Sequence, residues 1–315
     1  MDEPGRAPAI KPTRILLTGA TGFIGRHVQH VLLDAGCAVT ALVRAQSPRR
    51  NVLLPGVEVL TGALDDVPLL LDALPQVDLV VYVAGSVRGR EANDFRAANI
   101  DGIAALVEAA AGTGGTRVVL VSSLAASRPA LSAYAASKRA GEALLQRSGL
   151  EWVVLRPPAV YGPGDTEMRP LLASLRRGFV PLLGPRGQRL SLLHARDLAH
   201  AIVAVVMHFE ACAGRVFDLD DGRPGGYSWP ELIAAVRGAR RYLALRVPRG
   251  LLALVARINE YLSRQLGYQP MLTPGKVHEL CEPYWLCNNL ALTAATNWSP
   301  QIQLHDGVRD TFSRT

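Results

Sequence analysis

A tyrosine and a lysine four residues apart, Tyr134 and Lys138, have the types and the spacing needed to move a proton. They fall in the segment Ser132–Ser148, which predicts a helix, so both side chains share one face. A free tyrosine has a pKa of about 10, and a nearby ammonium is expected to lower that pKa toward neutrality. Ser123 follows a predicted strand, Thr116–Ser122, whose C-terminal end points toward the same site. The three side chains predict an acid–base centre.

A run of glycines near the N-terminus forms a second feature that could do chemistry. The run TGATGFIG joins a predicted strand, Arg14–Thr18, to a predicted helix, Phe23–Ala35. Its glycines permit a tight turn, close approach of a diphosphate, and close packing of the helix on the strand. The N-terminus of the helix attracts phosphate through its N–H groups and its dipole. This pattern predicts a dinucleotide site made by Gly19, Thr21, Gly22, Phe23, Ile24 and Gly25.

The end of the second predicted strand, Ala38–Arg44, bears on which dinucleotide is bound. A carboxylate at that place would bind the ribose 2′-OH of NAD and repel a 2′-phosphate. Arg44, with Arg49 and Arg50 nearby, offers guanidinium groups to that phosphate instead. We therefore expect NADP(H) to be favoured over NAD(H), with dual specificity and a solvated Arg44 as the alternative.

The elements that must position these residues alternate between apolar runs and amphipathic segments, as in parallel sheets with crossover helices. This order predicts an α/β fold, a Rossmann doubly wound parallel sheet with a smaller C-terminal lobe. We expect a flexible tail at 1–12, an NAD(P)-binding domain at 13–155, and a mainly substrate-binding lobe at 156–315, partly interleaved with that domain. The other expected strands are Val57–Thr61, Val77–Ala84 and Glu151–Leu155, and the other helices Leu64–Leu74, Asp94–Ala111, Arg196–Phe209 and Pro230–Gly238.

Composition excludes several classes of protein. The chain has 315 residues, of which 49% are hydrophobic and 19% charged, enough to bury a large core. Its net charge of +7 is carried by scattered arginines, so we expect no nucleic-acid partner. The sequence shows no secretory signal and no membrane span, which favours the cytoplasm. The four cysteines lack metal-ligand spacing, so no metal is expected.

The glycine turn, the strand that ends in two serines and the YxxxK helix together resemble the extended short-chain dehydrogenase/reductase superfamily, also called the NAD-dependent epimerase/dehydratase family. The resemblance implies that Tyr134 acts as general acid or base, that Ser123 binds the reacting oxygen, and that Lys138 holds the nicotinamide ribose. It also implies a homodimer. Further cofactor contacts that the resemblance implies are Ala84, Gly85, Asn99 and Pro157, besides Tyr134 and Lys138.

Three departures from the nucleotide-sugar members of this family bear on the substrate. Ala159 and Leu190 stand where those enzymes carry a diphosphate-binding Asn and Arg, with Arg189 one residue out of register. Leu124 and Ala125 stand where 4,6-dehydratases carry Asp and Glu. We therefore favour an oxidoreductase that interconverts a secondary alcohol and a ketone on a hydrophobic, steroid-like small molecule. The alternatives are a nucleotide-sugar epimerase of the same fold and a non-catalytic NADP-binding regulatory subunit.

The C-terminal half carries a further resemblance. The segments 158–164 and 271–275 resemble the 3β-hydroxysteroid dehydrogenase-like branch of the family. The segment Val247–Leu262 predicts an amphipathic helix, which we expect to pack into the core of the lobe. A pocket wall and a peripheral membrane contact are the alternatives for this helix. His194 and Asp197 are expected to make structural hydrogen bonds.

Overall fold

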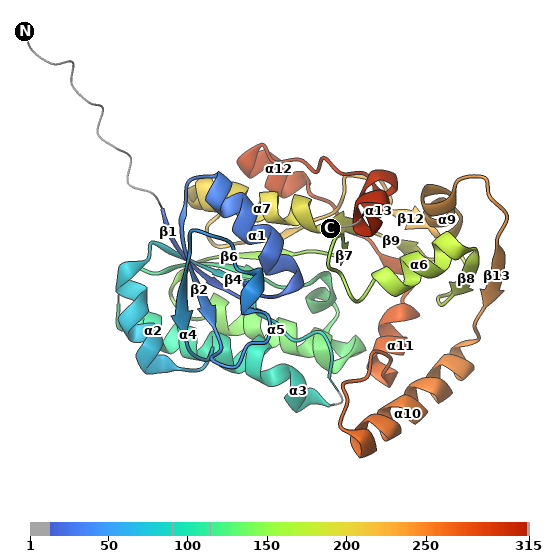
Figure 1. The fold of residues 1–315 in the computed structure, drawn as a ribbon, viewed down its shortest axis with the longest axis horizontal. Coiled ribbons are helices and arrows are strands. Elements are labelled where there is room, and N and C mark those ends of the chain that lie inside the picture. The colour runs from blue at the N-terminus through green and yellow to red at the C-terminus, as the bar shows by residue number, and fades with distance from the viewer. Residues whose placement is uncertain (1–12, 90, 114, 314–315) are drawn as a thin grey trace, which may run out of the picture.

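The apolar runs between the predicted helices form one parallel sheet of seven strands (Figure 1). The computed structural model describes residues 13–89, 91–113 and 115–313, so the tail expected at 1–12 lies outside the described residues. Spatial order in the sheet is β3-β2-β1-β4-β5-β6-β11, and the order reverses between β1 and β4, where such folds bind ligands. The strands are β1 (Arg14–Thr18), β2 (Ala38–Val43), β3 (Val57–Thr61), β4 (Leu79–Tyr82), β5 (Arg117–Val121), β6 (Glu151–Arg156) and β11 (Arg215–Asp218).

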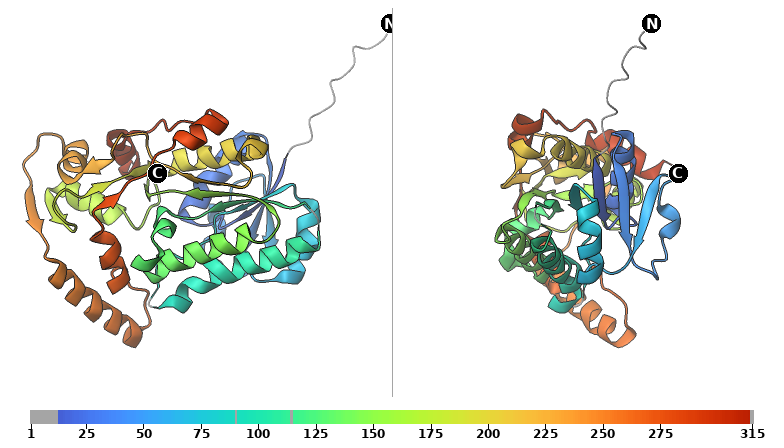
Figure 2. Two further views of the ribbon diagram at one scale, coloured as in Figure 1. Left: turned by 180° about the vertical axis from the view of Figure 1, so that it is seen from behind. Right: turned by 90° about the vertical axis from the view of Figure 1, so that its left-hand side faces the viewer.

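Helices cover both faces of this sheet, as the two views of Figure 2 show. Each face has its own apolar core, with Val28, Leu32 and Ile202 on one side and Leu70 and Leu106 on the other. The helices on the first side are α1 (Phe23–Asp34), α7 (Ala195–Met207), α8 (Phe209–Cys212) and α12 (Leu290–Thr296). Those on the second side are α2 (Val67–Ala73), α4 (Gly102–Ala111) and α5 (Ala133–Gln146).

The helix expected over Asp94–Ala111 is interrupted. A short helix, α3 (Ala92–Arg96), passes into a π-helical segment, Ala97–Asp101, before α4 begins at Gly102. A residue of β4 stabilises this wider turn: the Tyr82 hydroxyl donates a 2.8 Å hydrogen bond to the carbonyl oxygen of Ala98. Such segments occur often at functional sites, and this one contains Asn99.

The second half of the chain builds a lobe beside the C-terminal ends of the strands and also contributes β11 to the sheet. Its core contains Tyr161, Leu172, Trp229 and Leu232. The strands of the lobe are β7 (Ala159–Tyr161), β8 (Phe179–Leu182), β9 (Arg189–Leu190), β10 (Leu192–His194), β12 (Tyr227–Ser228), β13 (Leu243–Arg246) and β14 (Tyr284–Trp285). Its helices are α6 (Arg169–Arg177), α9 (Trp229–Arg237), α10 (Arg249–Leu266), α11 (Pro274–Leu280) and α13 (Leu304–Phe312).

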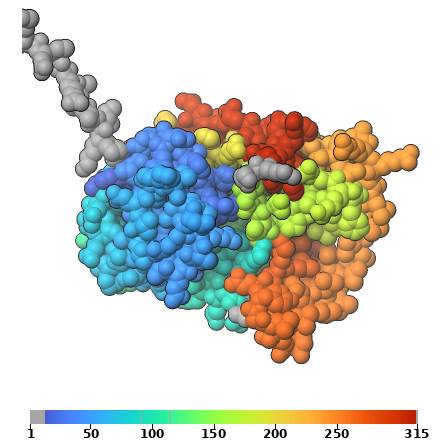
Figure 3. All heavy atoms as spheres, viewed as in Figure 1, coloured from blue at the N-terminus to red at the C-terminus, as the bar shows by residue number. Residues whose placement is uncertain are grey.

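The amphipathic helix expected at 247–262 forms as α10, but it does not pack into the core of the lobe as expected. Leu252, Ala256 and Ser263 are its buried residues, and they face a small cluster that includes Val277 of α11. The rest of α10 projects from the molecule, and in Figure 3 the orange segment that contains it stands out at the lower right. Among the described residues, no helix has the length and apolar character to cross a bilayer.

Candidate active site

The glycine turn after β1 brings three backbone segments into close contact. Gly19 has a φ of +71°, which favours glycine, and a Cβ there would lie 2.7 Å from the backbone nitrogen of Ala84. A Cβ on Gly25 would lie 2.1 Å from the carbonyl oxygen of Gly19. Larger residues at either position would therefore separate β1, α1 and the end of β4.

The N-terminus of α1 opens from this turn toward the crevice between β1 and β4. Gly22 is its N-cap, and among the described residues no side chain accepts a hydrogen bond from the first N–H groups of the helix. Thr21, Phe23 and Ile24 lie in the same turn and are partly exposed. A helix N-terminus without a side-chain cap suits a bound diphosphate. The residues present therefore fit a dinucleotide.

Arg44 comes directly after β2 and is exposed. Because Thr18 of β1 pairs with Leu42 of β2, Arg44 lies at the same edge of the sheet as the glycine turn. Arg50 donates hydrogen bonds to the carbonyl oxygen of Arg44 at 3.4 Å and to the hydroxyl of Thr61 at 2.9 Å. These contacts hold the backbone beneath Arg44 and leave its guanidinium available to an anion.

The residues predicted for proton transfer meet at the C-terminal end of β5. Tyr134 and Lys138 lie on successive turns of α5, and Ser123 follows β5 after one intervening residue. The Ser123 hydroxyl lies near enough to the Tyr134 phenol to act on its pKa, and the Nζ of Lys138 donates to the carbonyl oxygen of Val121 at 2.9 Å. The structure thus brings all three side chains together.

The protonation states at this centre differ from the sequence-based expectation. Burial raises the pKa of Tyr134 to about 12, although its hydrogen bond with Ser123 acts in the opposite direction. Burial also lowers the pKa of Lys138 to about 8. The expected lowering of the tyrosine pKa by the lysine is therefore wrong for this structure. The Tyr134 phenol is therefore protonated at neutral pH, which is the form that can donate a proton.

Asn99 binds the loop after β4 rather than pointing its polar atoms away from the protein. Its Oδ1 accepts from the backbone nitrogen of Ser86 at 3.1 Å, and its Nδ2 donates to the carbonyl oxygen of Ser86 at 3.0 Å. The same Nδ2 donates to the hydroxyl of Ser137 on α5 at 2.9 Å. Gly85 is held so close that a Cβ there would lie 3.1 Å from Oδ1. Asn99 therefore positions the Gly85 backbone.

The remaining predicted cofactor contacts lie at strand ends. The backbone nitrogen of Ala84 donates to the Thr18 hydroxyl at 3.2 Å, which ties the end of β4 to that of β1. Pro157 is buried just after β6, and its carbonyl oxygen accepts from the backbone nitrogen of Leu124 at 2.8 Å. Both residues therefore lie at the same edge of the sheet as the glycine turn and Ser123.

A buried carboxylate, Glu142, lies one turn beyond Lys138 on α5, and sequence reasoning missed it. Arg156 donates two hydrogen bonds to its oxygens, at 2.8 and 2.6 Å. Burial alone would raise the pKa of Glu142, but the hydrogen bonds, Arg156 foremost, hold that pKa below its ordinary value. The charge of Glu142 also favours the ammonium form of Lys138. The four-residue spacing from Tyr134 through Lys138 to Glu142 could have predicted that Glu142 lies on the same face of the helix.

A cavity of about 180 Å³ lies beside Tyr134, between α3, the start of α5 and the segment that joins α10 to α11. The hydroxyl of Ser132, the N-cap of α5, donates to the carboxylate of Glu279 and so ties α11 to this end of α5. Sequence reasoning could not place α11 here, because nothing local indicates a contact so distant along the chain. The apolar lining residues are Val87, Phe95, Pro270, Met271 and Pro274, and the charged ones Arg88, Glu91, Glu260, Lys276 and Glu279.

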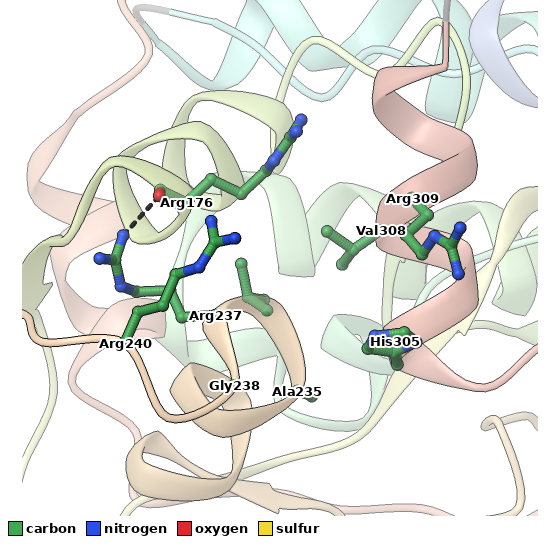
Figure 4. A pocket seen from close by; sticks show the side chains of 9 residues that line it. Arg176, Ala235, Arg237, Gly238, Arg240, His305, Val308 and Arg309 are labelled. Atoms are coloured by element: carbon green, nitrogen blue, oxygen red, sulfur yellow. Dashed lines mark hydrogen bonds between the residues drawn. The ribbon is translucent and has the colours of Figure 1, made fainter.

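A larger cavity, about 310 Å³, lies elsewhere, between α6, α9 and α13 (Figure 4). Its described lining residues include none of the predicted site residues. Arg237 in its wall donates to the carbonyl oxygens of Leu175 and Arg176 at the end of α6. Cations stabilise the C-terminus of a helix, so these contacts have a structural explanation. We therefore take the cavity beside Tyr134 as the candidate active site.

Arg189, His194 and Asp197 make structural contacts. The guanidinium of Arg189 donates to the carbonyl oxygen of Gly226 at 3.0 Å and lies 3.4 Å from a carboxylate oxygen of Glu231. His194 caps α7, and Asp197 accepts two backbone N–H groups at 3.1 and 2.9 Å. The structural roles predicted for His194 and Asp197 are confirmed.

Several known proteins are similar to this chain in sequence. A family model described as the NAD dependent epimerase/dehydratase family matches residues 15–219. The chain is 36% identical over 275 residues to a ceramide reductase of Caulobacter vibrioides, with 86% of this chain and 85% of that protein covered. It is 26% identical over 339 residues to a 3 beta-hydroxysteroid dehydrogenase/Delta 5→4-isomerase of Mycobacterium tuberculosis, with 87% and 90% covered.

The fold is also similar to that of a solved enzyme. The crystal structure of a UDP-glucose 4-epimerase with UDP-glucose, from Thermotoga maritima, superposes with a TM-score of 0.71 over 95% of this chain and 97% of that one. Sequence identity is 18%, so the likeness is one of fold. It confirms the predicted Rossmann architecture.

Proposed function

The chain belongs to the NAD-dependent epimerase/dehydratase family, and we propose that it is a reductase that converts a ketone on a hydrophobic, lipid-like molecule to a secondary alcohol. The observation that carries this proposal is the Tyr134 phenol, which lies near Ser123 and beside a cavity that α10 and α11 border. Because the pKa of this phenol is raised to about 12, it is a proton donor at neutral pH. Reduction is the direction that consumes such a proton.

In this mechanism the reduced nicotinamide, when bound, supplies the hydride to the carbonyl carbon. The hydroxyl of Ser123 donates a hydrogen bond to the carbonyl oxygen and orients it toward Tyr134. As negative charge grows on that oxygen, the Tyr134 hydroxyl gives it a proton and becomes a phenolate. The ammonium of Lys138, one turn away on α5, holds the nicotinamide ribose.

NADP(H) is the cofactor that we propose over NAD(H). The glycine turn fits either dinucleotide, so the choice depends on the adenosine end. Arg44 supports the choice, because its exposed guanidinium lies at the same edge of the sheet as the turn and can form a charge-assisted fork with a 2′-phosphate.

A long apolar substrate is supported by the cavity and by two relatives. Val87, Phe95 and Met271 give the cavity an apolar wall. Its polar surface includes Arg88 and Lys276, which are paired with Glu167 and Glu279. Such a lining suits an apolar molecule with a few polar groups beside the ketone. The two relatives are named for ceramide and for a hydroxysteroid, which are both lipids. We therefore propose a long-chain or steroid-like ketone.

A nucleotide-sugar epimerase of the same fold is the alternative, favoured by the structural likeness to the UDP-glucose enzyme. Against it, Ala159 has no polar side chain to hold a diphosphate, and Arg189 is engaged by Gly226 and Glu231. These contacts would have to break before Arg189 could bind a substrate.

A turnover assay tests the proposal. The full chain is mixed with NADPH and, in detergent micelles, with a ceramide analogue in which a ketone replaces a secondary hydroxyl, or with a 3-ketosteroid. We expect the absorbance of NADPH to fall with at least one of them, and calorimetry to detect no binding of UDP-glucose. Micromolar binding of UDP-glucose, with no oxidation of NADPH by any lipid ketone, would favour the epimerase.

A further inference from the structure

One face of α10 is apolar and uncovered. Leu251, Leu254, Val255, Ile258, Tyr261 and Leu262 recur at intervals of three and four residues, which places them on one side of the helix. All are exposed, with Leu254 at 55%, Ile258 at 50% and Tyr261 at 64%. The adjoining face, which contains Leu252, Ala256 and Ser263, is the one that packs in the protein. We call the six exposed residues the α10 surface.

The chain before α10 also exposes apolar side chains. Strand β13 pairs with β8 and exposes Leu243 and Leu245, and Tyr242 beside them is exposed as well. In Figure 1, β13 and α10 follow one another along the right-hand margin of the molecule. Uncovered apolar side chains gathered on consecutive elements mark an interaction site.

Positive charge accompanies the apolar residues. The segment 239–271 contains six arginines and one acidic residue, Glu260, which give a net charge of +5 out of the +7 of the whole chain. Arg257 and Arg264 are seven residues apart on α10, so they lie on one side of the helix, and both are exposed. An apolar stripe bordered by arginines suits the interface of a bilayer that contains anionic lipids.

The α10 surface adjoins the candidate active site. Glu260 belongs to α10 and lines the cavity beside Tyr134, while its neighbours Ile258 and Tyr261 are exposed. Met271 and Pro270, just after α10, line the same cavity. A molecule held by the α10 surface is therefore next to the site of proton transfer.

We propose that the α10 surface docks the protein on the surface of an anionic phospholipid bilayer. A second copy of the chain is disfavoured as occupant, because a symmetric pairing would bring two segments of charge +5 against each other. The idea that the bilayer supplies the ketone substrate rests on the proposed function. The docking itself does not depend on that function. The apolar residues enter the headgroup region and the arginines bind lipid phosphates.

Vesicle co-sedimentation tests the docking. The full chain is mixed with vesicles of phosphatidylcholine alone or of phosphatidylcholine with phosphatidylglycerol. We expect binding to the anionic vesicles that weakens with added salt, and a loss of affinity of about tenfold or more in the double variant Leu254→Glu/Ile258→Glu. Arg257→Gln/Arg264→Gln should remove much of the preference for anionic lipid.

Leu290→Glu is the matched control, because Leu290 is an exposed leucine, at 71%, on α12, away from α10. It should bind as the unmodified chain does. Docking is refuted if the unmodified chain does not sediment with anionic vesicles, or if the control loses as much affinity as Leu254→Glu/Ile258→Glu. A dimer that this double variant dissociates, without vesicle binding, would assign the surface to a second copy.

Activity on a water-soluble ketone separates this proposal from the proposed function. The variants of the α10 surface should reduce such a ketone at the rate of the unmodified chain, and lose rate only with a ketone embedded in vesicles. If neither the unmodified chain nor any variant reduced a ketone, the proposed reductase activity would be refuted. The result of the vesicle-binding experiment would not change.

Discussion

The ammonium of Lys138 donates a 2.9 Å hydrogen bond to the carbonyl oxygen of Val121, the last residue of β5. This contact holds the lysine at the end of the strand that leads to Ser123. Burial there lowers the pKa of Lys138 to about 8, so its charge changes within the range of ordinary assays. Cofactor binding and proton transfer can therefore be probed by pH.

The affinity for NADPH should fall as pH rises through about 8, because Lys138 then loses the proton that makes it a cation. Lys138→Met should bind NADPH more weakly at neutral pH and show no such fall. Fluorescence titration from neutral pH upward measures both effects. If the variant kept the same pH dependence, another group would be responsible.

Tyr134→Phe should lower the turnover of a lipid ketone by about 10²–10⁴, the usual contribution of a positioned acid. NADPH affinity should change little, since the ring still packs near Phe95 and Lys138 remains. Tyr242→Phe, at an exposed tyrosine, is the control and should keep full turnover. Turnover close to that of the unmodified chain in Tyr134→Phe would rule out the proposed proton donor.

Ser123→Ala should raise the pKa of Tyr134 further, because the hydrogen bond from Ser123 is what lowers it. Turnover should fall while NADPH affinity stays nearly constant. Steady-state kinetics alongside a binding titration makes the comparison. Equal losses of affinity and turnover would instead indicate a distorted crevice.

Arg44→Asp should reverse the preference for NADPH over NADH, because the carboxylate repels a 2′-phosphate and accepts a hydrogen bond from a ribose hydroxyl. Arg186→Asp makes the same change of charge at an exposed arginine before β9 and should leave the preference intact. Titration with each dinucleotide gives the ratio of affinities. An unmodified chain that binds both equally would contradict the assignment of Arg44.

Glu142→Leu should destabilise the fold by about 3–5 kcal/mol, since it leaves the half-buried Arg156 without its partner. Glu142→Leu/Arg156→Met should recover part of this loss. Since the pKa of Glu142 is lowered in the folded state, its contribution is present above the ordinary pKa of 4.5 and is lost as pH falls below it. Denaturant unfolding between neutral and acid pH should show a flatter profile in Glu142→Leu.

The elements that sequence reasoning placed best depend on local pattern. Strand β1 and strand β3 have the predicted bounds, and α1 ends one residue before the predicted Ala35. In these elements an apolar run or an amphipathic period fixes the structure, and the glycines fix the turn after Thr18. The positions of Tyr134 and Lys138 follow from α5, which differs from the prediction by one residue at its start and two at its end.

What sequence reasoning missed depends on contacts between distant segments. The π-helical turn around Asn99 is held by the Tyr82 hydroxyl on β4, and nothing near Asn99 indicates it. The approach of Glu279 to Ser132 brings α11 to the active site. The periodicity of α10 identified a helix with apolar faces but could not say whether other elements would cover both of them.

The strand β11 has a consequence for the order in which the protein can be made. It pairs with β6 from Arg215 to Asp218, and the core on that side of the sheet also includes Leu292 and Trp298. During synthesis, β6 therefore remains an unprotected edge until more than sixty further residues have left the ribosome, and its apolar face stays open longer still. A nascent or truncated chain that ends near Leu155 should accordingly aggregate or recruit chaperones rather than accumulate as an independent nucleotide-binding unit.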